Sequence, residues 1–257
     1  MLQEVIKSED ETMVQIEAEG ISTRELNLML RQAVDDGVTK IVLRDVYGQR
    51  YIGTDLNEIV DIEIFGTPGN DLGAFMDGPR ITVRGNAQDG CGNTMNSGEI
   101  VVHGHAGDIT CLSARGGKIF VRDGVGYRAG IHMKEYGDQK PALVVGHTAQ
   151  DFVGEYMAGG ILVLLGLNLL KGEKHRANYI GTGMHGGVIY LRGEVEDYQL
   201  GKEVGIAELD ENDYLNLEKI VREFASHFDY DAEKILKLDF IKLFPLHLRP
   251  YGRLYTY

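Results

Sequence analysis

The chain has little of several residue types on which common protein classes depend. Its 257 residues include two cysteines, Cys91 and Cys111, five prolines and no tryptophan. Two cysteines provide no basis for a disulfide framework. The longest apolar run, ILVLLGLNLL at 161–170, is too short to span a bilayer, and the first residues lack the apolar core of a secretory signal. We therefore expect a soluble, cytoplasmic protein with no membrane partner.

Positive charge is also scarce, because 26 Lys and Arg face 39 Asp and Glu and leave a net charge of −13. A nucleic-acid-binding protein normally presents a basic face, so we expect no nucleic-acid partner.

The common catalytic and metal-binding motifs GxSxG, CxxC and HExxH do not occur in the sequence. Neither cysteine has an adjacent basic residue that would favour a reactive thiolate. We predict no catalytic, cofactor-binding or metal-binding residue in this chain.

Glycine is abundant, with 34 residues, and it belongs to an internal repeat. Strand-like segments recur with a 19-residue interval that is broken twice, by five extra residues before Leu143 and by eight before Met184. The segments begin at Ile62, Ile81, Ile100, Ile119, Leu143, Leu162 and Ile189, with a weaker copy at Ile41. A glycine column holds Gly53, Gly73, Gly92, Cys111, Gly130, Gly154 and Gly181. A methionine column, three residues later, holds Met76, Met95, Ala114, Met133, Met157 and Met184.

A repeat of this length cannot fold alone, but stacked repeats bury their apolar faces on one another. We predict a mainly β fold: a single-stranded right-handed parallel β-helix of about seven or eight coils, with helical caps at both ends. A left-handed hexapeptide helix is the competing fold, although its coil length favours 18 residues. The glycines are expected at tight corners and the methionines in the interior.

Two glycine-rich stretches resemble a dinucleotide fingerprint: GTGMHG at 181–186 and GVGYRAG at 124–130. That fingerprint requires a strand before it and a helix after it, so that the helix N-terminus faces the pyrophosphate. A strand-like segment follows the first stretch, and only a short segment follows the second. We therefore assign both to the repeat.

Three further groups of residues could carry chemistry. Asp89, Asp108 and Asp151 recur at one repeat position, where turn formation is commoner than a Ca²⁺ site. His103 and His105 lie two residues apart at a strand end, as surface or hydrogen-bonded polar groups commonly do. The eight-residue insertion contains Lys171, Lys174, His175 and Arg176, and it is either a solvated loop or a docking loop for an acidic partner.

The ends of the chain differ from the repeat and suggest three regions: 1–40, 41–200 and 201–257. A helix is predicted over 21–37, with Ser22 as N-cap and Glu25 completing a capping box. Two more helices are expected from Asp210 and Asp231. The aromatic final stretch, FIKLFPLHLRPYGRLYTY, either packs along the solenoid or forms a docking tail.

The segments GTPGNDLGAFMDG, GNAQDGCGNTMNSGEIVVHGHAGD and IGTGMHGGVIYLRG resemble the GXGXG repeat domain at the end of the glutamate synthase large subunit. The same domain forms one of the subunits of formylmethanofuran dehydrogenase. The resemblance covers roughly 50–195, and HFDYDAEKIL followed by FIKLFPLHL is similar to the glutamate synthase tail. In that family the domain is a right-handed β-helix that carries neither the glutaminase cysteine nor the flavin and iron–sulfur sites.

We expect this chain to be a separate polypeptide, unlike the domain at the end of the large subunit. The resemblance therefore implies a non-catalytic structural subunit of a glutamate synthase made of separate polypeptides. Its partners would be the glutaminase, FMN/synthase and electron-donor subunits, with FMN and iron–sulfur clusters on those partners and no cofactor here. A subunit of formylmethanofuran dehydrogenase or another redox complex is an alternative. A stand-alone β-helix binding protein or enzyme is another, and a homo-oligomer stays open.

Overall fold

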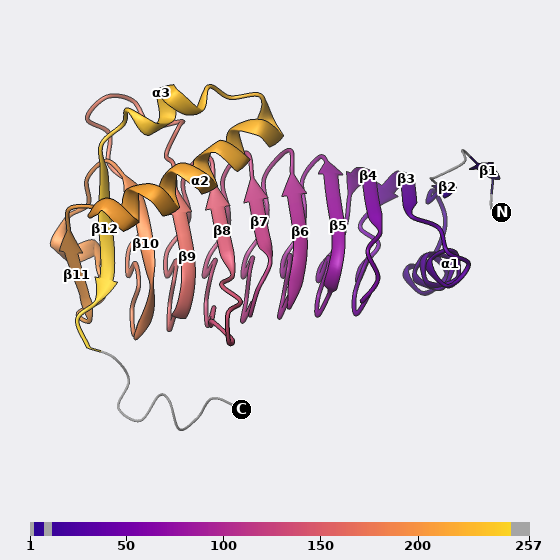
Figure 1. Cartoon of the computed structure of the whole chain (residues 1–257), viewed down its shortest axis with the longest axis horizontal. Coiled ribbons are helices and arrows are strands. Elements are labelled where there is room, and N and C mark those ends of the chain that lie inside the picture. Colours follow the sequence, from indigo (N-terminus) through magenta and orange to yellow (C-terminus); the bar gives the residue numbers. More distant parts are fainter. Residues whose placement is uncertain (1–2, 8–11, 248–257) are drawn as a thin grey trace.

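The computed structural model describes residues 3–7 and 12–247, and these residues form one twelve-stranded sheet that winds into a solenoid (Figure 1). The elements, in chain order, are β1 (Gln3–Lys7), β2 (Thr12–Glu17), α1 (Thr23–Asp35), β3 (Lys40–Tyr47), β4 (Asp61–Thr67), β5 (Asp77–Arg84), β6 (Ser97–Val102), β7 (Lys118–Val121), β8 (Ala142–Val145), β9 (Ala158–Leu164), β10 (Gly186–Arg192), the 3-10 turn η1 (Asp197–Gln199), β11 (Val204–Ala207), α2 (Glu211–Phe228), α3 (Ala232–Leu236) and β12 (Phe240–Pro245).

Strands β2 to β10 pair in parallel in the order of the sequence, which confirms the predicted β-helix. The first inward residue of each strand lies in register with its equivalent in the next coil, as Ile62 does with Ile81. The weak upstream copy is part of this column, because Ile41 pairs with Ile62. All of these side chains are buried in one continuous core. The right-handed sense of winding stays a prediction.

Each coil turns through three residues of left-handed conformation that alternate with residues of other conformation. In one coil these are Ile109, Cys111 and Ser113, with φ of 49°, 64° and 53°. The N–H groups of Ile109 and Ser113 donate to carbonyls of the following coil, at 2.8 and 2.9 Å, and that of Cys111 donates to the preceding coil, at 2.7 Å. The alternation therefore directs successive peptide groups toward the following and the preceding coil and joins this corner to both neighbours.

The middle left-handed position is the glycine column, and glycine is favoured there because a Cβ would meet core side chains. A Cβ at Gly92 would lie 2.2 Å from Cδ1 of Ile119, and one at Gly73 would lie 2.8 Å from Cδ1 of Ile100. The flanking left-handed positions hold side chains as large as Phe152. The glycines thus make room for the strand residue of a neighbouring coil.

The coil with Cys111 shows how the glycine and methionine columns depend on each other. A Cβ at Gly73, Gly130 or Gly181 would lie 2.8, 3.1 or 2.9 Å from Sδ of the methionine three residues later. In the exceptional coil the residue three positions after Cys111 is Ala114, and both are buried. The larger residue in one column is therefore accommodated by the smaller residue in the other, as expected for a volume exchange within one coil.

The N-terminal end of the solenoid is covered by α1 as predicted (Figure 1). Ser22 is its N-cap, and the Ser22 hydroxyl accepts a hydrogen bond from the Glu25 N–H at 3.2 Å. Leu26 and Leu30 of this helix belong to the same buried core as the strands. The helix therefore closes the apolar interior, which would otherwise be open at its first coil.

The predicted C-terminal helices exist, but they lie elsewhere than expected. Asp210 and Asp231 are the N-caps of α2 and α3. Instead of covering the end of the coil, α2 runs diagonally across the outer face of the strands (Figure 1). Its apolar residues, such as Phe224, pack on outward side chains of the sheet, such as Phe120 and Val163. The reason is that the outer face of β6 to β10 is itself apolar, and α2 buries it from water with its own apolar face.

The last coil is closed by β12, which pairs antiparallel with both β10 and β11. Part of the aromatic C-terminal stretch thus packs on the solenoid, and residues 248–257 lie outside the described residues.

A polar network fixes α2 to this end of the solenoid. The Tyr190 hydroxyl donates to Asp213 Oδ1 at 2.7 Å, and Lys242 Nζ lies 2.6 Å from Asp213 Oδ2. Asp213 is buried in this network.

The contact between the two columns predicts strong coupling between Cys111 and Ala114. Ala114→Met alone should overpack the coil and cost roughly 1–3 kcal/mol. Cys111→Gly alone should leave a void and cost on the order of 1–2 kcal/mol. The double variant restores the pattern of the other coils, so the two changes should couple by about 0.5–3 kcal/mol in denaturant unfolding. Additive costs would show that the two side chains do not share one space.

The buried carboxylate of α2 predicts a pH-dependent contribution to stability. Burial acts to raise the pKa of Asp213, but hydrogen bonds from Lys242, the Asp210 backbone and Tyr190 outweigh it and hold the pKa below its usual value. Stability from a lowered pKa is present above the unfolded-state pKa of about 3.9 and is lost as the pH falls through the folded-state pKa. Asp213→Asn should therefore cost about 1–3 kcal/mol at neutral pH.

The destabilisation by Asp213→Asn should shrink as the pH falls below about 4, because the unfolded-state carboxylate is protonated there first and the native carboxylate, whose pKa is lower, is protonated at still lower pH. The matched control is Asp55→Asn, at an exposed carboxylate, which should leave the free energy of unfolding nearly unchanged across the same range. Urea unfolding of the three proteins at several pH values measures this. A cost for Asp213→Asn that stays constant down to about pH 3 would contradict the proposed charge stabilisation.

Candidate functional site

The two fingerprint-like stretches are parts of the solenoid and lack the helix that a dinucleotide site needs. In GTGMHG, Gly181 is the corner glycine, with φ of 66°, and the strand β10 begins at Gly186. Gly183 packs under an aromatic ring, since a Cβ there would lie 2.5 Å from the Tyr156 ring. In GVGYRAG, Gly130 occupies the same corner position as Gly181. Both stretches therefore serve the stacking of coils.

The recurring aspartates accept hydrogen bonds from the backbone of the next coil. Asp89 Oδ1 accepts from the Asp108 N–H at 2.9 Å, and Asp108 Oδ1 accepts from the Tyr127 N–H at 2.8 Å. Asp151 makes the same bond to the N–H of Asn178 at 2.8 Å. These aspartates thus join adjacent coils through their carboxylates, and the predicted turn-forming role stays a prediction. Among the described residues, no group of three or more His, Cys, Asp or Glu side chains is arranged to hold a metal ion.

His103 and His105 have different surroundings although they are two residues apart. His103 Nε2 lies 2.9 Å from an Arg84 guanidinium nitrogen, and its ring meets the Phe228 ring edge-on at 5.1 Å. Burial, followed by the charges of Arg84 and Arg122, lowers the pKa of His103. The neutral ring is thus part of the packing between β6 and the end of α2. His105 is exposed.

Cys91 and Cys111 are free thiols, both buried in the core. They lie on neighbouring coils, and the Cys111 N–H donates to the Cys91 carbonyl at 2.7 Å. Burial raises the pKa of the Cys91 thiol to about 12. Burial, and to a lesser extent the nearby Cys91, also raises the pKa of Cys111. Neither thiol has the thiolate character of a nucleophile at neutral pH.

The insertion with four basic residues presents less positive charge than its sequence suggests. Lys174 pairs with Glu196, and Arg176 lies 3.3 Å from a Glu173 oxygen. His175 is buried, its Nε2 lies 2.9 Å from the Arg192 carbonyl, and burial lowers its pKa. These contacts favour a structured loop. Its use for docking stays a prediction.

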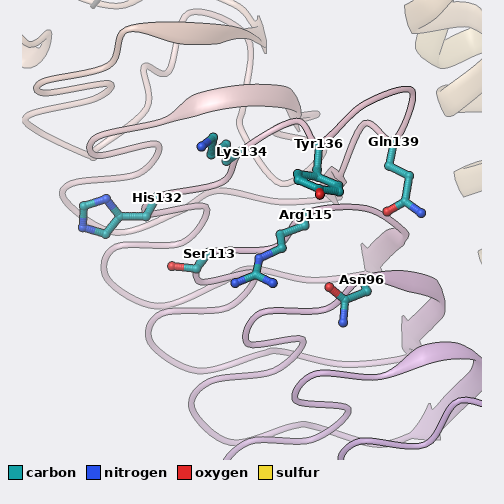
Figure 2. Close-up of a pocket in the computed structure, with 7 residues that line it drawn as sticks. All are labelled: Asn96, Ser113, Arg115, His132, Lys134, Tyr136 and Gln139. Carbon is teal, nitrogen blue, oxygen red and sulfur yellow. The ribbon is translucent and has the colours of Figure 1, made fainter. Parts of the chain in front are cut away.

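A polar pocket of about 450 Å³ lies beside the corner of three consecutive coils (Figure 2). Asn96, Arg115 and Lys134 occupy the same repeat position in these coils, each one residue after the methionine column. The Arg115 N–H donates to the Met95 carbonyl at 2.8 Å. The Lys134 N–H donates to the Ala114 carbonyl at 3.0 Å. These bonds fix the coil-to-coil register and stack the three side chains.

The far wall of the pocket comes from the five-residue insertion. Tyr136 and Gln139 form an antiparallel bridge in which each N–H donates to the other's carbonyl at 3.1 Å. Gly137 makes the turn between them, with φ of 60°. Tyr136 and Gln139 line the pocket opposite Asn96 and Arg115 (Figure 2). The break in the 19-residue interval is visible in the sequence. The pattern alone does not predict that the inserted residues line a pocket beside the corner of the coil.

Comparison with known proteins supports the resemblance seen in the sequence. Residues 11–246 match the GXGXG motif family. The uncharacterized protein MJ1350 of Methanocaldococcus jannaschii is 45% identical over 251 residues, which cover 95% of this chain and 96% of that protein. No helix in the described part of the chain is long and apolar enough to cross a membrane.

Two glutamate synthases are also similar to this chain. The ferredoxin-dependent glutamate synthase of Pyropia yezoensis is 30% identical over 169 residues, which cover 61% of this chain and 10% of that protein. Ferredoxin-dependent glutamate synthase 2 of Synechocystis sp. is 29% identical over 168 residues, covering 60% of this chain and 10% of that protein. The chain thus spans about a tenth of the length of the glutamate synthases it matches.

The burial of both cysteines predicts that the folded protein resists thiol reagents. At pH 8, labelling with a disulfide reagent such as DTNB should be on the order of a thousandfold slower in the native protein than after unfolding, because the thiolate fraction follows the pKa. The unfolded protein should release two equivalents of product, one for each cysteine. Rapid labelling of one cysteine in the native state would contradict the raised pKa values, and Cys91→Ala would then identify which thiol reacts.

Proposed function

The chain belongs to the GXGXG motif family, and on that premise we propose that it is a non-catalytic structural subunit of a glutamate synthase assembled from separate polypeptides. In this proposal it corresponds to the C-terminal domain of the large subunit. The glutaminase, FMN/synthase and electron-donor subunits carry the reactive groups, including FMN and iron–sulfur clusters. The assembly makes glutamate from glutamine and 2-oxoglutarate in the cytoplasm.

The extent of the similarity is the observation that carries the proposal. About six-tenths of this chain is similar to about one-tenth of each ferredoxin-dependent glutamate synthase. An activity that belongs to those long proteins needs their remaining parts as well. This chain would obtain the equivalent parts from partner subunits.

The contacts of the reactive-looking side chains support a structural role. The core cysteines are packed, the recurring aspartates bind backbone N–H groups of the next coil, and His103 packs against α2. A solenoid of stacked coils offers a rigid, extended surface of the kind used for binding partners. These observations are those expected of a scaffold.

The outer face of the corners carries aromatic stacks, with Tyr156 and Tyr179 exposed, that suit a protein interface. Phe152 and Tyr179 stack at 4.8 Å between ring centroids, and the Arg128 guanidinium lies 4.5 Å from the Phe152 centroid. His132 and Tyr156 stack in the same way at 5.3 Å. Tyrosine, phenylalanine and arginine are enriched at protein interfaces. We define Arg128, His132, Phe152, Tyr156 and Tyr179 as the corner aromatic surface.

The proposal predicts that activity appears only in the assembled complex. The isolated chain should purify without a flavin or iron–sulfur spectrum and should have no glutaminase or glutamate synthase turnover. Affinity purification of the tagged chain from its native host should recover flavin- and cluster-containing subunits in stoichiometric amounts, with glutamate synthase activity. A stoichiometric flavin spectrum or turnover by the pure chain would contradict the proposal. Recovery of formylmethanofuran dehydrogenase subunits instead would favour the alternative assembly.

Surface variants test whether the corner aromatic surface contributes to that assembly. Tyr156→Ala should reduce recovery of the partners several-fold, because exposed aromatic residues supply a large part of interface free energy. Tyr214→Ala is the matched control, since Tyr214 is an exposed tyrosine on α2. Tyr156→Ala also removes the stacking on His132 and the ring that covers Gly183, so recovery is compared at a temperature at which thermal unfolding shows both variants to be folded. Equal recovery of partners by both variants would exclude Tyr156 from the interface.

A further inference from the structure

The charges that line the corner pocket differ from those elsewhere on the solenoid. On the outer face of the sheet, charged residues of adjacent coils have opposite sign. Arg80 lies 3.9 Å from an Asp61 oxygen and 3.3 Å from a Glu99 oxygen. Arg84 lies 2.8 Å from a Glu63 oxygen. On this face, each of these basic side chains is therefore neutralised by a carboxylate of an adjacent coil.

In the pocket two cations occupy the same position of adjacent coils. Arg115 and Lys134 are in register, so their backbones are about 4.8 Å apart. Within the described residues, neither side chain has an ion pair or a side-chain hydrogen bond, and no carboxylate lines the pocket. The neighbouring carboxylate Glu135 is directed away, because its Oε1 accepts from the Gly160 N–H at 3.1 Å. Like charges placed opposite each other are unfavourable unless an anion lies between them.

The remaining lining residues, which include Asn96 and His132, add polar groups beside the two cations. Ser113 and the insertion residues Tyr136 and Gln139 contribute a hydroxyl, a phenol and an amide (Figure 2). The guanidinium and ammonium groups provide only donors, which match carboxylate and phosphate oxygens. A volume of about 450 Å³ is that of a small-molecule site. The net charge of −13 makes general attraction of anions unfavourable, so selectivity must arise locally.

We propose that this pocket binds a small organic anion, and that Arg115 and Lys134 hold one of its carboxylate or phosphate groups. Tyr136 and Gln139 of the insertion line the same pocket and supply further hydrogen-bonding groups for the anion. All groups of the site belong to this chain, and one of them, His132, also belongs to the corner aromatic surface, so the pocket borders the surface proposed for the assembly.

Calorimetric titration of the full chain with citrate, with inorganic phosphate and with neutral glucose tests the proposal. Citrate or phosphate should bind saturably at one site, glucose should not bind, and added NaCl should weaken the binding. Arg115→Gln and Lys134→Gln should each weaken the better anion at least about tenfold, since each removes a charge-assisted hydrogen bond. Neither variant should lower the thermal midpoint without anion, because each removes like-charge repulsion. The preference between the two anions reports whether carboxylate or phosphate is the natural group.

Two controls separate a built site from general charge effects. Lys219→Gln removes an exposed cation on α2 and should bind the anion as the native chain does. Tyr136→Ala removes part of the wall but no charge, so it should weaken binding less than Arg115→Gln does. Absence of saturable binding by both anions, or equal weakening by Lys219→Gln and Arg115→Gln, would overturn the proposal. Binding of a glutamate-rich peptide without binding of either small anion would also overturn it.

Discussion

The structure depends on one constraint: at each corner, three left-handed residues must alternate with residues of other conformation. This alternation points successive N–H groups toward the following coil, the preceding coil and the following coil again. The corners from Gly73 to Gly154 are thereby tied to both neighbouring coils by backbone hydrogen bonds, which buried peptide groups require. The left-handed conformation costs roughly 1–2 kcal/mol for a residue with a Cβ. The coil-to-coil bonds and the buried apolar column must together outweigh that cost in every repeat.

The same constraint explains why one column is glycine and its flanking columns are not. The left-handed conformation alone does not require glycine, since Ile109, Arg128 and Phe152 all adopt it. Glycine is needed where the Cα–Cβ direction points at the strand residue of another coil, as at Gly92 beneath Ile119. The exceptional Cys111 shows that space is the decisive factor, because it occurs in the one coil where the methionine column holds alanine.

The solenoid could be predicted from the sequence because a fixed interval aligns equivalent residues in three dimensions. The strand positions, the inward methionines and the N-caps at Ser22, Asp210 and Asp231 follow from local pattern, and the structure confirms them. The position of α2 could not be predicted in this way. It depends on apolar residues such as Phe120 that face outward from the strands, and the interval does not show which face of the sheet needs a cover.

The candidate site was harder to predict because it depends on where the repeat is interrupted. Within a regular coil the inward positions are filled, and the outward charges are commonly neutralised by the next coil, as with Arg84 and Glu63. Residues of an insertion need neither fill the interior nor neutralise a charge on the next coil. The two insertions nevertheless have different outcomes. The longer one pairs Lys174 and buries His175, whereas the shorter one folds back at Gly137 and borders a pocket that two cations without ion pairs also line. The binding chemistry of such a solenoid is therefore to be sought where an insertion meets outward side chains that the neighbouring coils leave unpaired.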